Sequence, residues 1–210
     1  MIQVLVADDH RLVRQGLMEI LSESSDIVVT GEASNGRDVL TKISKHDYDA
    51  VLLDISMPGR SGLDILKDLK SLKPDLPVLM LSMHPEEHYA IRALKAGASG
   101  YLTKDVAPEK LIQAVRKVST GRKYITASLA EKLAFQLSEG VEGNPHDRLS
   151  DREYEVMCRI ASGKTVSEIA RDLSLSVKTI STYRARALDK MGMKTNAELT
   201  HYAIKRGLIE

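Results

Sequence analysis

The chain has 210 residues, of which 43% are hydrophobic and 28% are charged, and its net charge is +1. This composition excludes an intrinsically disordered chain and is typical of a globular protein with one large domain or two ordinary ones. There is no apolar run of the roughly 18–20 residues that a membrane span needs and no secretory signal at the start, so a cytoplasmic protein without a membrane partner is expected.

Residues 1–122 alternate short apolar runs with segments whose apolar positions recur three and four residues apart. Short, continuously apolar strands are typical of a parallel sheet that is covered on both faces. Five such repeats, joined by right-handed crossovers, predict a doubly wound, flavodoxin-like (βα)5 domain of the α/β class. The apolar runs are residues 2–7, 27–30, 50–53, 77–81 and 100–102.

Residues 123–146 carry a weaker pattern. Positions 128–137 predict a short amphipathic helix. Positions 138–145 are acidic, contain glycine and proline and show no period, which indicates a flexible linker.

Residues 147–210 predict an all-α module of four short helices. Its excess of lysine and arginine over acidic residues gives weak support for an anionic partner. The single cysteine of the chain, Cys158, lies among apolar neighbours in the first of these helices and is expected to be a buried structural thiol. The predicted helices start at the capping box Ser150–Glu153, at the capping box Thr165–Glu168, after Ser176 and at Asn196, and the first and third stop at Gly163 and Gly192.

Five chemically active residues fall at the ends of the predicted strands. Asp8 and Asp9 follow the first strand, Asp54 the third, Ser82 the fourth and Lys104 the fifth. Open α/β sheets bind ligands beyond the carboxyl ends of their strands, where the strand order reverses. For the order 2-1-3-4-5 this point lies between strands one and three, so the three aspartates are expected in one crevice.

Three neighbouring carboxylates repel one another unless a hard cation such as Mg²⁺, which prefers oxygen ligands, lies between them. Lys104 can neutralise a phosphoryl oxygen and the Ser82 hydroxyl can donate to another, so the set favours phosphoryl transfer to a carboxylate. Each residue alone has a simpler explanation, since a strand-end aspartate often caps a helix and a lysine is often solvated. The joint occurrence of all five at strand ends favours a functional site over these separate structural explanations.

The segment 168–184 has the frame of a helix-turn-helix, with a short turn and small Ala170 where two helices would cross. An ordinary helical bundle with solvated basic residues is the alternative. In the third helix a polar, small-residue face fits the DNA major groove. The predicted base contacts are Lys178, Ser181, Thr182 and Ala185, and the predicted phosphate contacts are Thr179, Arg184, Arg186 and Lys194.

Residues 6–10, 52–59, 80–83 and 97–104 resemble the receiver domains of two-component response regulators, and residues 149–209 resemble the LuxR/NarL-type DNA-binding domain. The chain is therefore similar to response regulators of the NarL/FixJ family. The resemblance implies that Asp54 is the phosphoacceptor and that Ser82 and Tyr101 form a switch pair. It also implies that Asp8, Asp9, Asp54 and the carbonyl of Ser56 arrange Mg²⁺.

Two positions depart from the family pattern. Asp105 follows Lys104 where many receivers have a proline in a cis peptide, which leaves the isomer of this bond open. Tyr183 stands where the DNA-binding family usually has histidine, which concerns fine specificity more than the class of the domain.

We therefore expect a regulator rather than an enzyme, with its own phosphoryl transfer and dephosphorylation as the only catalysis. The expected partners are a sensor histidine kinase, double-stranded DNA, and a second copy of the chain upon phosphorylation or on DNA. One alternative is an enzyme that turns over an aspartyl-phosphate, which would need a general acid or base and a substrate cap. The other is an architectural regulator that needs no phosphorylation. The six histidines lack the spacing of a zinc site, so no transition metal is expected.

Overall fold

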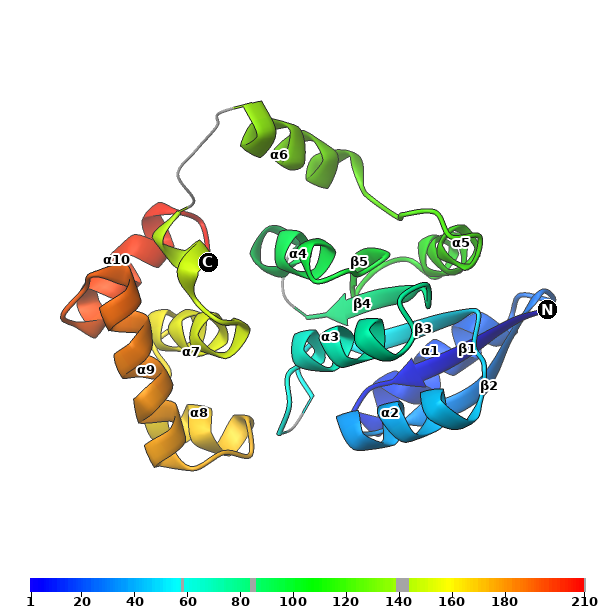
Figure 1. Ribbon diagram of the computed structural model, residues 1–210, viewed down its shortest axis with the longest axis horizontal. Helices are drawn as coiled ribbons and strands as arrows, with labels where there is room; N and C mark the ends of the chain where they lie inside the picture. The colour runs from blue at the N-terminus through cyan, green and yellow to red at the C-terminus, as the bar shows by residue number, and fades with distance from the viewer. Residues whose placement is uncertain (58, 84–85, 139–143, 210) are drawn as a thin grey trace. The chain divides into compact units, whose positions relative to one another are not determined.

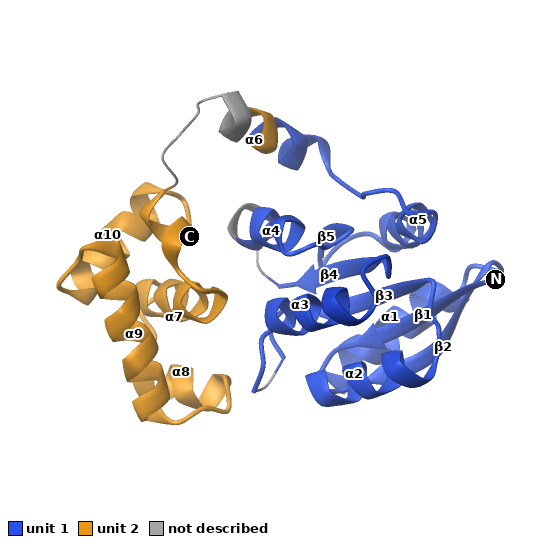
Figure 2. Cartoon of the chain, viewed as in Figure 1, with its two compact units in different colours: residues 1–132 blue, residues 133–210 orange. Residues whose placement is uncertain are grey.

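The computed structural model describes residues 1–57, 59–83, 86–138 and 144–209. It contains two compact units, Met1–Lys132 and Leu133–Glu210, which we call the N-terminal and the C-terminal unit (Figure 2). Among the described residues, no helix combines the length and the hydropathy needed to cross a membrane.

The N-terminal unit is built on a sheet of five parallel strands in the order β2-β1-β3-β4-β5, which confirms the predicted doubly wound class (Figure 1). Strands β3 and β4 are buried along their whole length, as expected for a sheet covered on both faces. The strands are β1 (Ile2–Ala7), β2 (Ile27–Ala33), β3 (Ala50–Asp54), β4 (Val78–Ser82) and β5 (Gly100–Thr103).

Helices cover both faces of this sheet. Alternate strand residues such as Val4, Leu52 and Leu79 join one apolar core with α1 and α5, and α2 packs beside α3. Local caps fix two of the helix starts, because the side chains of Asn35 and Ser61 accept hydrogen bonds from the backbone of the first turn. The helices are α1 (Arg11–Ser22), α2 (Gly36–Lys45), α3 (Gly62–Leu72), α4 (Glu86–Lys95) and α5 (Pro108–Ser119).

The chain after α5 stays on the N-terminal unit. The backbone N–H of Tyr124 donates to the carbonyl of Ser99 at 2.7 Å, and Tyr124 forms a parallel bridge with Gly100 of β5. Helix α6 (Ala127–Ser138) follows, and Leu129 in its first turn is buried. The first compact unit therefore continues beyond residue 122 into α6.

The segment predicted as a flexible linker is only partly described. Residues 139–143 lie outside the described residues. Pro145–Arg148 form a short 3-10 helix, η1, which the sequence pattern did not indicate.

The C-terminal unit contains the four predicted helices: α7 (Asp151–Ala161), α8 (Val166–Asp172), α9 (Val177–Met191) and α10 (Asn196–Lys205). Both predicted capping boxes are present, at Ser150 and Thr165. Gly192 ends α9 in the left-handed conformation, with φ 67°. Helix α10 begins at Asn196 as expected, but its cap is Thr195, whose hydroxyl accepts from the backbone of Glu198.

The core of this unit joins the two helices of the predicted helix-turn-helix to α7. Val156 and Ile160 of α7 pack with Ile169, Leu173 and Ile180. Cys158 is buried on α7, as predicted. The two helices on either side of the turn therefore share one apolar core, which also contains the small residue Ala170.

Candidate functional site

The three predicted aspartates meet at the carboxyl end of the sheet. Asp54 is the last residue of β3, and Asp8 and Asp9 directly follow β1. One potential ligand atom from each of Asp8, Asp9, His10 and Asp54 lies within 4.8 Å of the others. Asp8 and Asp54 are almost completely buried, whereas the Asp9 side chain keeps 27% of its exposure.

Lys104 lies between the two buried carboxylates. Its Nζ is 2.6 Å from Asp8 Oδ2 and 3.0 Å from Asp54 Oδ2. The residue follows β5 directly, and its backbone N–H donates to the carbonyl of Ser82 at 2.8 Å. No cis peptide bond occurs among the described residues, so the Lys104–Asp105 bond is trans. The structure thus brings one cation to two of the three predicted carboxylates.

Burial and neighbouring charges together shift the pKa values of Asp54 and Lys104. Burial raises the pKa of Asp54, and the charge of Asp8 adds to this effect, while Lys104 and the backbone of Ser56 oppose it. Burial also disfavours the charged form of Lys104, but Asp54 and Asp8 outweigh it, so the pKa of Lys104 is raised. A buried ammonium therefore stays charged beside a carboxyl group that is costly to ionise.

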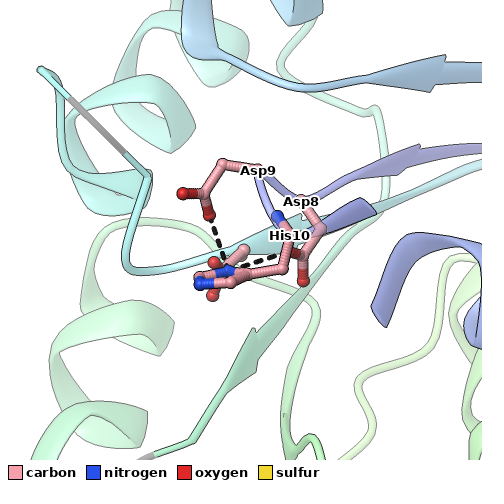
Figure 3. A group of neighbouring side chains, drawn as sticks. Asp8, Asp9 and His10 are labelled. Carbon is pink, nitrogen blue, oxygen red and sulfur yellow. Dashed lines mark hydrogen bonds and ion pairs between the residues drawn. The ribbon is translucent and has the colours of Figure 1, made fainter. Parts of the chain in front are cut away.

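Two further residues shape the site and were missing from the predicted set. His10 places Nδ1 3.0 Å from Asp9 Oδ1, and its backbone N–H donates to Asp8 Oδ1 at 2.8 Å (Figure 3). Arg14 of α1 donates from Nη1 to the carbonyl of Asp8 at 2.7 Å and from Nε to Glu32 at 2.8 Å. His10 follows the acidic pair directly in the sequence, which is the one signal that could have pointed to it.

The donor set suits a hard divalent cation. Three carboxylates offer oxygen ligands, and the buried Asp54 Oδ1 has no hydrogen bond of ordinary geometry among the described residues. An acidic cluster with an unsatisfied buried oxygen could therefore hold a metal ion. Ser56 is half-buried two residues after Asp54, and the role of its carbonyl as a ligand stays a prediction.

Gly62 at the start of α3 lies against the backbone of Asp54. Its N–H donates to the carbonyl of Ile55 at 2.8 Å, and a Cβ at this position would lie 2.1 Å from the Asp54 carbonyl oxygen. A residue without a side chain is needed for this close approach. The helix and the aspartate therefore hold fixed positions relative to each other.

The predicted switch residues lie on adjacent strands. Ser82 ends β4 and is fully buried, and Tyr101 in β5 pairs in register with Met80 and is also buried. Tyr101 lines a cavity of about 180 Å³ between β5, α4, α5 and the segment leading to α6. The other lining residues are Glu86, Leu102, Thr103, Val106, Lys110, Tyr124 and Thr126.

Helix α9 of the C-terminal unit has a buried face and the predicted polar face. Its core face is buried and consists of Ile180, Ala187, Leu188 and Met191. All four predicted base contacts are exposed, and so are Arg186 and Lys194, while Thr179 and Arg184 are half-buried.

Some of these polar groups are already engaged within the unit. The Thr179 hydroxyl is 2.8 Å from that of Ser176, and the Thr182 hydroxyl donates to the carbonyl of Lys178. Arg184 Nε donates to Asn196 Oδ1 at 2.5 Å. The backbone N–H of Lys194 donates to Glu198. The exposed polar face is thus preorganised by local hydrogen bonds.

Two protein-family models match this chain, one in each compact unit. The model of the response regulator receiver domain matches residues 4–116. The model described as bacterial regulatory proteins, luxR family, matches residues 147–203.

Individual proteins match over nearly the whole chain. Response regulator UvrY of Escherichia coli K12 is 39% identical and aligns over 99% of this chain and 96% of its own. Response regulator GacA of Pseudomonas protegens is 36% identical, with 100% and 99% coverage. A structure of RcsB from Salmonella enterica serovar Typhimurium, bound to the promoter rprA with the phosphomimetic BeF3⁻, is 28% identical with a TM-score of 0.64, covering 96% of this chain and 97% of RcsB.

Proposed function

Because the chain belongs to the two-component response regulators that join a receiver domain to a LuxR-type helix-turn-helix domain, the NarL/FixJ group, we propose that Asp54 is its phosphoacceptor. The chain is a DNA-binding transcriptional regulator, and its family implies a kinase partner. The observation that carries the assignment of Asp54 is its buried position at the carboxyl edge of the sheet, next to Asp8 and paired with Lys104.

The proposed reaction is phosphoryl transfer from a sensor histidine kinase, or from a small phosphodonor. An Asp54 carboxylate oxygen attacks phosphorus, and an acyl phosphate forms. The bond between phosphorus and the histidine nitrogen of the kinase breaks, and that nitrogen retains its electron pair. Hydrolysis of the acyl phosphate, in which water attacks phosphorus, returns the carboxylate and inorganic phosphate.

Each residue around Asp54 has its own proposed role in this transfer. We propose that Asp8, Asp9 and Asp54, with the carbonyl of Ser56, hold Mg²⁺, which when bound neutralises phosphoryl charge. The Lys104 ammonium leaves its present pairing with Asp54 and contacts a phosphoryl oxygen. The Ser82 hydroxyl donates to another phosphoryl oxygen. Tyr101, the second residue of the predicted switch pair, responds to the phosphorylation.

For the C-terminal unit we propose that α9 enters the major groove of double-stranded DNA. Lys178, Ser181, Thr182 and Ala185 would meet base edges. Thr179, Arg184, Arg186 and Lys194 would bind phosphates. The RcsB structure, described as bound to promoter DNA in the presence of a phosphomimetic, supports the link between receiver and DNA binding.

We further propose that phosphorylation acts through a homodimer. A single small module with few phosphate contacts binds weakly at physiological salt. Two modules on neighbouring half-sites gain the effective concentration of a tethered pair. We also propose that the protein acts in the bacterial cytoplasm, because its DNA target lies there. The proposed division is 1–122 for the receiver, 123–146 for the helix and linker, and 147–210 for the DNA-binding domain.

The decisive experiment compares the full chain with the Asp54→Asn variant, each with Mg²⁺ and an acyl phosphate donor. Intact mass should show one labile phosphoryl group on the wild-type chain alone. DNA affinity of the wild type should rise about 5- to 150-fold, the range of a typical coupling energy. Light scattering should show more dimer.

Three outcomes would contradict these assignments. Equal labelling of the variant would exclude Asp54 as the acceptor. An unchanged DNA affinity would favour a regulator that needs no phosphorylation. A gain in affinity by a chain that stays monomeric on and off DNA would exclude the dimer route.

A further inference from the structure

Helices α9 and α10 are joined by a side-chain hydrogen bond at the edge of the exposed face of α9. Arg184 Nε donates to Oδ1 of Asn196, the first residue of α10, at 2.5 Å. Arg184 lies one turn after Ser181 and directly before Ala185, two of the predicted base contacts. The arginine thus stands at the border of the face proposed to meet DNA.

The partner of this arginine is neutral, which distinguishes it from other cations of the C-terminal unit. Lys164 and Arg159 face the carboxylate of Asp172, and Lys190 faces that of Glu153. An amide oxygen accepts a hydrogen bond without cancelling the charge of the guanidinium. The pairing therefore orients Arg184 and leaves its full positive charge available.

Arg184 uses only Nε for this bond, and its two terminal nitrogens form no hydrogen bond or ion pair with residues 144–209. These two donors form the fork that matches the oxygens of a phosphate. A half-buried side chain fixed at Nε loses less conformational entropy when the fork binds.

The Asn196 side chain is free for this task because another residue caps the helix. The hydroxyl of Thr195 accepts from the backbone N–H of Glu198, and the Glu198 carboxylate accepts from the backbone of Lys194. The start of α10 is thus stabilised without the Asn196 amide.

We infer that Asn196 is a positioning residue for DNA binding, which holds Arg184 with its terminal nitrogens aimed at a backbone phosphate. The inference rests on the proposed function of α9 and adds a residue from α10 to it. A phosphate contact carries no sequence information, so Asn196 should affect all DNA sequences alike.

The test is a double-mutant cycle in the full chain, with binding to a mixed-sequence DNA duplex measured by fluorescence anisotropy over a range of salt concentrations. Asn196→Ala should weaken binding about two- to tenfold, the cost of ordering one long side chain. Arg184→Ala should weaken binding more and lower the salt slope by about one unit. Adding Asn196→Ala to Arg184→Ala should change nothing further.

Two variants separate this role from a general effect on α10. Asn196→Asp keeps the acceptor and suits the first helical turn, but its charge opposes the phosphate, so binding should weaken and the salt slope should flatten. His201→Ala, at an exposed position of the same helix, should leave binding unchanged.

The outcomes separate the inference from the function on which it rests. If Asn196→Ala binds as tightly as wild type, or loses the same factor in both backgrounds while its thermal unfolding is unchanged, the positioning role is wrong. If the wild-type chain itself binds no duplex, the proposed DNA contact of α9 fails instead.

Discussion

Thr126 donates its hydroxyl hydrogen to the carboxylate of Glu86, with oxygen–oxygen distances of 2.8 and 2.7 Å. The same hydroxyl accepts from the backbone N–H of Leu129 at 3.1 Å. One side chain therefore fixes both the beginning of α4 and the first turn of α6. Thr126 and Glu86 line the same cavity as Tyr101. The segment leading to α6 also pairs with β5, the strand of Tyr101, through the bridge between Tyr124 and Gly100.

Thr126→Val should loosen the start of α6. The substitution removes both hydrogen bonds while keeping the shape of the side chain, and loss of such a cap costs about 0.5–2 kcal/mol. Amide hydrogen exchange at Leu129 and Ala130 should become faster by about 2- to 30-fold. Ser128→Ala, at an exposed neighbouring position, should leave these rates unchanged. Unaltered exchange in Thr126→Val would show that burial of Leu129 alone holds the helix.

Mg²⁺ should stabilise the N-terminal unit, because a cation that binds only the folded site shifts the unfolding equilibrium. At a concentration of about 100 times Kd the gain is about 2.7 kcal/mol. Calorimetry with Mg²⁺ and with chelator should therefore show a higher unfolding temperature for the metal-bound chain. Asp9→Asn should lose most of this shift, whereas Asp75→Asn, an exposed aspartate remote from the site, should retain it. A shift that survives in Asp9→Asn would remove Asp9 from the ligand set.

Acid should lower the free energy of unfolding of the C-terminal unit, because Glu153 becomes protonated. Burial would raise the pKa of this carboxyl group, but hydrogen bonds from Lys190 and from Ser150 outweigh it, so the pKa lies below its usual value. A carboxyl group with a lowered folded-state pKa adds stability above its unfolded pKa, and this stability is lost as the pH falls through the folded value.

Lys190→Met tests this contribution. The Lys190 ammonium lies 2.6 Å from Glu153 Oε2 and is 40% exposed, so its loss should cost about 1 kcal/mol near neutral pH and less in acid. Urea unfolding at several pH values, followed by the helical signal, measures the difference. Lys205→Met, an exposed lysine on α10, serves as the control. A cost that does not depend on pH would mean that the stem of Lys190, and not its charge, is what matters.

Lys178→Ala and Arg186→Ala should weaken DNA binding in different ways. Loss of a base contact should cost about 1–3 kcal/mol on the preferred sequence and relax the preference at one position. Loss of a phosphate contact should weaken all sequences alike and lower the salt slope by about one unit. Selection of bound duplexes from a random pool, followed by salt titrations with the selected duplexes, distinguishes a base contact from a phosphate contact. A changed sequence preference in Arg186→Ala with an unchanged salt slope would reverse the assignment.

Local rules explain why so much of the fold could be predicted. Runs of buried apolar residues define the strands, and the boxes at Ser150 and Thr165 are closed by residues three positions away. The acidic site could be predicted for a similar reason. Its residues all follow strands, and a parallel sheet brings those strand ends together.

Contacts between distant segments could not be read from the pattern. Arg14 donates to the carboxylate of Glu32, Tyr124 pairs with β5, and Asn196 accepts from Arg184, and no local motif predicts any of these three contacts. Asn196 in particular resembles an ordinary helix start. In the structure Thr195 is the cap, and the Asn196 amide instead accepts from Arg184.

The single cysteine gives this protein a built-in reporter. Cys158 lies buried on α7, and the chain has no other thiol. A thiol reagent added to the intact protein therefore reads the opening of the C-terminal unit alone, whatever happens at the aspartates. Following the labelling rate with and without a phosphodonor would measure, in one residue and without any engineered probe, whether charge placed on the receiver reaches the interior of the DNA-binding unit.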